Sequence, residues 1–150
     1  MTEVLFYHLQ NRPVEQVLPA LLEKSLERGW RVVVQSGSDE RIEALDAHLW
    51  TYREDSFLPH GTAREAESAA QPILLTVSDH NPNGASIRFL IDGAPMPTEP
   101  SAYQRIVLLF DGDDPDALSV ARERWRDVKA AGLDATYWQA DEQGRWQRQA

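Results

Sequence analysis

The chain has 150 residues, of which 42% are hydrophobic and 26% charged, and its formal net charge is -9. This length and composition are typical of one folded domain and argue against an intrinsically disordered chain. It contains no cysteine, which excludes disulfides, a thiolate zinc site, a cysteine-ligated iron–sulfur cluster and a cysteine nucleophile. The acidic balance argues against strong direct binding to nucleic acid, because that binding depends on cations that neutralise phosphates.

Targeting and membrane signals are not found in this sequence. The start, MTEVLFYHLQNR, has an acidic third residue and only a short apolar run, so it lacks the basic start and long apolar segment of a signal peptide. No later run approaches the ~20 apolar residues that span a membrane. We therefore expect a cytoplasmic protein with no membrane attachment.

The first half of the sequence alternates between strand and helix patterns. In chain order these are a strand at 4–9, a helix at 13–29, a strand at 30–37 and a helix at 38–50. Ser38 is placed to cap the second helix, and Gly29 to end the first. The polar stretch 53–72 is predicted to be a long loop, a kind of segment that often has a function.

The second half begins with a predicted hairpin. Residues 72–78 and 87–93 are predicted strands, and Asn83-Gly84 between them is typical of a hairpin turn. Residues 105–112 are the most hydrophobic strand pattern and are expected near the centre of the sheet. A helix follows at 113–132, and residues 133–149 predict a last strand and a turn.

This order of elements predicts the α/β class, as a three-layer α/β/α single domain over residues 1–150 with a mixed, mostly parallel sheet. The predicted hairpin is what would make the sheet mixed. The topology is Rossmann-like without a nucleotide-binding fingerprint, because the first turn, LQNRPVEQ, has no glycine and neither G-x-G-x-x-G nor a P-loop occurs.

Residue patterns for catalysis are weak. The histidines, His8, His48, His60 and His80, lack the spacing of a zinc site. No serine lies in the G-x-S-x-G context of a hydrolase. We predict no catalytic residue, no metal and no cofactor, and keep a small nucleotide-binding or hydrolytic α/β enzyme as the alternative.

The helix at 113–132 places cations beside a tryptophan. On an ideal helix, one broad apolar arc contains Leu118, Val120, Ala121, Trp125, Val128 and Ala131. Trp125 lies toward the edge of this arc, and just beyond it come Arg122, Arg126 and Lys129. An indole beside guanidinium groups suits a ligand that has an apolar side chain and negative charge. A core tryptophan beside a solvated, cationic helix face explains the same pattern.

A second cluster follows the helix at 38–50. Trp50 ends that helix, and Phe57 and His60 lie in the polar stretch behind it. Aromatic residues on such a loop either pin it to the core or offer a docking surface. A homo-oligomer that buries Trp50 and Phe57 against a second copy is a further possibility.

Several segments together resemble the family of the chi subunit of bacterial DNA polymerase III holoenzyme: FYHL, ERGWRVVV, LDAHLW followed by DSFLPH, and ARERWRDVKAAG. The resemblance implies a noncatalytic accessory subunit of the clamp-loader assembly. It also implies binding to the acidic carboxyl-terminal tail of single-stranded-DNA-binding protein, and a bridge from that protein to the psi subunit during DNA replication.

The resemblance also assigns site residues. The tail-binding arginine falls on Arg122, its aromatic partner on Trp125 and the following cation on Arg126, with Lys129 as a further cation. An apolar wall of the tail site falls on Phe110, next to Asp111, which is expected to repel an acidic tail.

Two further features follow from the resemblance. Leu118 stands where the family can place a lysine. The psi-facing surface falls on Trp50, Phe57 and His60, and without psi this surface would meet another clamp-loader subunit or a helicase.

Overall fold

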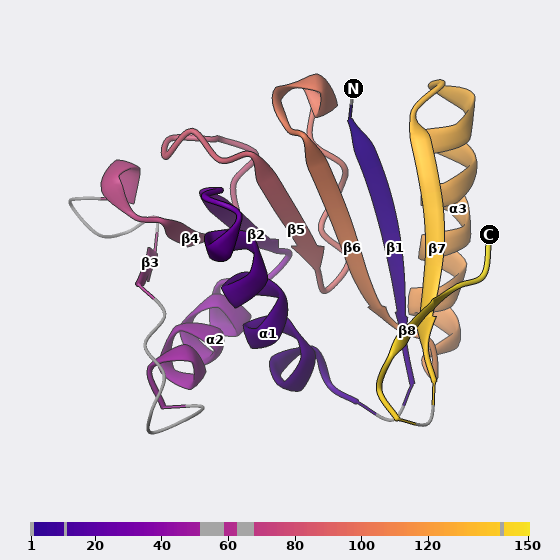
Figure 1. Cartoon of the computed structure of the whole chain (residues 1–150), viewed down its shortest axis with the longest axis horizontal. Coiled ribbons are helices and arrows are strands. Elements are labelled where there is room, and N and C mark those ends of the chain that lie inside the picture. The colour runs from indigo at the N-terminus through magenta and orange to yellow at the C-terminus, as the bar shows by residue number, and fades with distance from the viewer. Residues whose placement is uncertain (1, 11, 52–58, 63–67, 142) are drawn as a thin grey trace.

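The computed structural model describes residues 2–10, 12–51, 59–62, 68–141 and 143–150 (Figure 1). Three α-helices occur in these ranges: α1 (Val14–Glu27), α2 (Asp39–Thr51) and α3 (Pro115–Ala130). The strands are β1 (Glu3–Leu9), β2 (Val32–Ser36), β3 (His60–Thr62), β4 (Ile73–Thr76), β5 (Ile87–Ile91), β6 (Arg105–Asp111), β7 (Asp134–Ala140) and β8 (Trp146–Arg148).

The strands form one sheet in the order β3-β4-β2-β5-β6-β1-β7-β8. All neighbouring pairs are parallel except β7 and β8. Helices α1 and α2 pack on one face and α3 on the other (Figure 1). The predicted three-layer α/β fold with a mixed, mostly parallel sheet is confirmed, as is the central place of the strand at 105–112.

The predicted hairpin between β4 and β5 is wrong. Both strands pair in parallel with β2, so that Val33 lies opposite Leu74 on one side and Arg88 on the other. The side chain of Asn83 is buried and donates to the carbonyls of Val32 and Gln71. Asn83 therefore anchors a crossover between β4 and β5 rather than a two-residue turn.

The antiparallel pair that makes the sheet mixed is instead β7 with β8. Their connection includes Gly144, whose φ of +81° suits glycine. Part of the predicted loop at 53–72 is also regular, because β3 pairs with β4 and a short 3-10 helix covers Ser68–Ala70.

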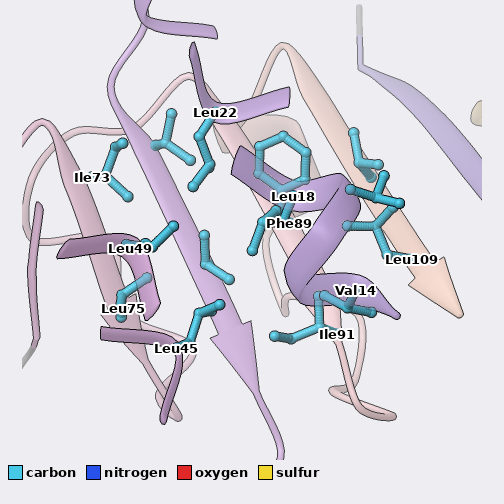
Figure 2. Packing of buried hydrophobic residues seen from close by; sticks show 14 of the residues in the cluster. Val14, Leu18, Leu22, Leu45, Leu49, Ile73, Leu75, Phe89, Ile91 and Leu109 are labelled. Carbon is cyan, nitrogen blue, oxygen red and sulfur yellow. The ribbon is translucent and has the colours of Figure 1, made fainter. Parts of the chain in front are cut away.

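One core cluster lies beneath α1 and α2. Figure 2 shows Leu18 and Leu22 of α1 and Leu49 of α2 pointing toward side chains of the sheet. Each of these leucines is at most 1% exposed, so truncating one to alanine is expected to cost about 2 to 5 kcal/mol of stability. A second cluster on the opposite face includes residues of α3.

Arg88 of β5 is fully buried in that second face. Its guanidinium donates to Gln35 Oε1 (3.0 Å), the Tyr103 hydroxyl (3.0 Å) and the carbonyl of His80 (3.1 Å), and also to the carbonyl of Ser78. No described carboxylate forms an ion pair with Arg88, and these bonds satisfy its buried guanidinium and fix the β4–β5 crossover onto the sheet.

The chain leaves β1 and β6 toward opposite faces of the sheet. β1 leads into α1 on one face, whereas β6 leads into α3 on the other, and the two strands are neighbours. Parallel sheets form crevices at such points, outside the carboxyl ends of the strands.

Among the described residues, no helix has the length and apolar character needed to cross a membrane.

Candidate functional site

Helix α3 begins and ends as its sequence predicts. The carboxylate of Asp114 accepts a hydrogen bond from the backbone N–H of Asp116 (3.0 Å), and Pro115 stands at the first turn. Gly132 follows the last turn with φ +77°.

The predicted apolar arc of this helix is wrong in part. Ala121 and Val128 are buried, and Leu118 and Trp125 are half-buried. Val120 is 37% exposed and Ala131 is also exposed. Because the sheet meets only the middle of the arc, both flanks of α3 border grooves.

The first groove, called the basic groove below, has a volume of about 520 Å³. It is lined by His8, Leu118, Arg122, Trp125, Arg126, Tyr137, Gln139, Gln149 and Ala150. Three of the predicted tail-binding residues therefore lie in one hollow. Within the described ranges, Arg122 and Arg126 form no ion pair.

Trp125 forms part of this groove without being sealed in the core. Its ring meets Phe6 and Tyr137 edge to face, at centroid distances of 5.2 and 6.0 Å. The Lys129 ammonium lies 5.5 Å from the indole centroid, a cation–π distance, although Lys129 does not line the groove. The indole thus offers apolar surface with cations around it.

His8 and Tyr137 form the opposite wall of the basic groove. His8 Nδ1 and the Tyr137 hydroxyl oxygen are 2.7 Å apart, within hydrogen-bond distance. Burial lowers the pKa of His8, and Asp113 and Asp111 offset part of this shift. Burial also raises the pKa of Tyr137, partly offset by Arg122. A protonated tyrosine hydroxyl therefore faces the groove beside a neutral imidazole.

Phe110 lines the second groove, described next, rather than this wall. Its ring is 5.3 Å from His8 and 6.0 Å from Tyr137, centroid to centroid, but it does not line the basic groove. The sequence patterns did not single out His8 and Tyr137 as binding residues. His8 lies near the carboxyl end of β1, a position that could have singled it out, whereas Tyr137 lies in the middle of β7.

The second groove, called the acidic groove below, lies on the other flank of α3 and has a volume of about 650 Å³. Its carboxylates are Glu15, Asp92, Asp111, Asp113, Asp114 and Asp116, and its cations are Arg12, Arg41 and Arg124. Asp111 is thus a residue of this groove and does not line the basic one. The expectation that Asp111 would repel a ligand of the Arg122 site stays a prediction, because Asp111 lines the neighbouring groove but still interacts electrostatically with His8 of the basic groove.

Arg41 closes one end of the acidic groove. It lies 2.8 Å from the carboxylate of Glu15 and 3.0 Å from that of Asp92, which joins α1, α2 and the end of β5. Burial by itself would raise the pKa of Glu15, but a backbone hydrogen bond and Arg41 together hold it below its ordinary value. The Glu15 carboxylate in this bridge is therefore charged at neutral pH.

The second predicted surface, that of Trp50, Phe57 and His60, lies at the far side of the sheet from α3 (Figure 1). Trp50 is 51% exposed at the end of α2, and its ring lies 4.3 Å from that of His60. His60 itself is only 4% exposed, with Nε2 3.1 Å from the carboxylate of Asp46. Phe57 lies outside the described residues. The structure thus brings Trp50 and His60 together, with only the indole on the surface.

In the described part of the chain, no group of three or more histidine or acidic side chains is arranged to hold a metal ion. The fold and the grooves define a small α/β protein with grooves of opposite charge on the two flanks of one helix. A family model described as DNA polymerase III chi subunit, HolC, matches residues 1–136. The chain belongs to this family, which gives it an accessory role in DNA replication.

Two relatives show how far the similarity extends. The chain is 32% identical over 91 residues to "Probable DNA polymerase III subunit chi" of Rickettsia prowazekii, which covers 61% of this chain and 55% of that protein. It is 24% identical over 135 residues to "DNA polymerase III subunit chi" of Pseudomonas aeruginosa, covering 88% of this chain and 92% of the relative. The chain thus spans about half of the first relative and nearly all of the second.

Proposed function

We propose that this protein is a noncatalytic adaptor of the clamp-loader assembly that binds the acidic carboxyl-terminal tail of single-stranded-DNA-binding protein. The observation that carries the proposal is the basic groove, in which Arg122 and Arg126 lie beside a half-buried Trp125 and have no ion pair with any described residue. The apolar end of the tail would pack against the indole, and the two guanidinium groups would bind its carboxylates.

The Tyr137 hydroxyl adds a neutral donor to this arrangement. It faces the same groove as Arg122 and keeps its proton because burial raises its pKa. When His8 donates from Nδ1 to the Tyr137 oxygen, the hydroxyl proton is left for a tail carboxylate, which can accept it in addition to the charged contacts. Leu118, which lines the groove in place of a cation, extends the apolar contact.

We propose that the Trp50 surface binds a second subunit, psi or another clamp-loader or helicase partner. An indole that is half exposed beside a buried histidine is suited to an aromatic anchor at an interface. In this arrangement Trp50 contacts the partner, and His60 supports the indole from below. The two sites lie at opposite sides of the sheet, so one subunit can bridge two proteins.

The test uses two ligands, the tail peptide and psi, and three variants, Arg122→Ala, Arg124→Ala and Trp50→Ala. Titration calorimetry with a peptide copying the tail of the organism's own single-stranded-DNA-binding protein is expected to show that Arg122→Ala loses about 1 to 3 kcal/mol of binding free energy. Binding is also expected to weaken with salt. Arg124→Ala, on the same helix but in the other groove, is the matched control and should bind as the parent does.

Trp50→Ala is expected to keep the tail affinity and to lose affinity for psi. Equal tail affinity for the parent and Arg122→Ala would contradict the tail site. Unchanged psi binding by Trp50→Ala would contradict the second site and leave the first standing.

A further inference from the structure

The acidic groove has the position of a ligand site. It lies at the carboxyl ends of β1, β5 and β6, where the chain leaves β1 and β6 toward opposite faces. Its floor contains apolar side chains, among them Leu9, Leu90 and Leu108. A hollow of about 650 Å³ with such a floor falls in the size range of ligand sites in proteins.

The charges around this groove favour a cationic ligand. Six carboxylates and three guanidinium groups line it, so its formal charge is 3 - 6 = -3. Arg41 is already engaged by Glu15 and Asp92. Four of the carboxylates, those in the segment 111–116, form the rim beside α3. Such a rim repels phosphate, which is the group that a nucleotide would place at this position.

Two side chains of α3 indicate a ligand that has apolar and carbonyl groups in addition to positive charge. Val120 lines the groove and yet is 37% exposed, which makes it one of the large apolar side chains that the fold leaves uncovered. Arg124 also lines the groove, and its Nε is shielded from solvent with no hydrogen-bond partner among the described residues. An apolar side chain can cover Val120. Because the Nε of Arg124 is closed to solvent, a carbonyl oxygen of the ligand can accept only from the terminal nitrogens of this guanidinium.

We propose that the acidic groove binds a basic peptide segment of a partner protein, with an apolar anchor on the groove floor and lysine or arginine side chains at the aspartate rim. Backbone carbonyls of the segment accept hydrogen bonds from Arg124. This site is separate from the basic groove, since α3 stands between them, and the proposal does not depend on what the basic groove binds.

The test uses a labelled synthetic peptide of about 14 residues, with leucines at i, i+3, i+4 and i+7 and lysines elsewhere. Fluorescence anisotropy with the whole protein is expected to show saturable binding that weakens with salt. A peptide of the same composition with scattered leucines is expected to bind at least several-fold more weakly. A peptide with glutamate in place of lysine is not expected to bind.

Two double variants that remove the same charge distinguish binding in the groove from attraction to the net charge of the protein. Asp113→Asn with Asp116→Asn is expected to weaken binding about three- to tenfold, as for the loss of two exposed charge contacts. Glu123→Gln with Asp127→Asn removes the same charge from exposed positions of α3 that line neither groove, and is expected to change the affinity less than twofold. Val120→Gln is expected to weaken binding without loss of fold, because Val120 is exposed.

Equal losses in the two double variants would show attraction to net charge and overturn the proposal. Equal affinity for the patterned and scattered peptides would overturn it as well, because the floor would then contribute nothing. Full displacement of the peptide by spermidine at matched charge concentration would assign the groove to small cations instead.

Discussion

The two flanks of α3 differ in charge although they belong to one helix. On one flank Arg122 and Arg126 line the basic groove, and on the other Asp116 and Val120 line the acidic groove. Residues two positions apart, such as Arg122 and Arg124, point into different grooves because each residue turns the helix by about 100°. A net charge of -9 for the chain therefore says little about either surface.

The helix dipole favours the same distribution. Asp113, Asp114 and Asp116 surround the amino-terminal end of α3, where partial positive charge accumulates, whereas Lys129 lies in its last turn. The aspartates that stabilise the start of the helix thus also form the rim of the acidic groove. The same aspartates can therefore stabilise the helix and contact a cationic ligand.

The largest expected effect comes from Trp125→Ala. Removal of the half-buried ring and its contacts with Phe6 and Tyr137 is expected to cost about 2 to 4 kcal/mol of stability. Tail binding should be lost with it, whereas binding of the basic peptide should persist at temperatures where the variant is folded. Urea unfolding and calorimetry measure these effects, and equal loss of both ligands would show that the grooves are not independent.

A smaller effect is expected from Gly112→Ala, in the loop that follows β6. A Cβ at this position would overlap His8 Nε2, so the imidazole or the loop must move. We expect a loss of about 1 to 3 kcal/mol, as for overpacking, and weaker binding in both grooves.

Combining Gly112→Ala with His8→Ala provides the control for this clash. The double variant should be more stable than the sum of the single effects predicts, as measured by a double-mutant cycle in urea. Simple additivity would show that His8 is not what Gly112 accommodates.

The smallest effect is that of pH on His8. Its pKa is lowered from 6.5 by burial, with Asp113 and Asp111 as partial offsets, so the folded state favours the neutral imidazole. The stability that the folded state gains from the neutral imidazole is fully present above about pH 6.5, and it is lost as the pH falls below that value. The urea midpoint of the parent should fall more between pH 7.5 and pH 5.5 than that of His8→Gln, and parallel profiles would contradict the role of His8.

Much of the fold followed from patterns in short stretches. The strands at β1 and β6 and the three helices lie where periodicity and capping place them. The hairpin prediction failed because Asn83-Gly84 is a local signal, while β2 buries both of its edges against β4 and β5. The lining of the basic groove was predicted in part, since Arg122, Trp125 and Arg126 share one helical flank, but His8 and Tyr137 come from distant strands.

Local chemistry in the sequence was thus enough to place the ends of α3 and the cluster of cations beside Trp125, because caps and helical periodicity act over a few residues. Only the tertiary structure decided that Arg88 is buried, that Val120 is uncovered and that a second groove of opposite charge opens beside α3. These features depend on which strands pair and which faces they cover, and such long-range burial is not encoded in any short segment.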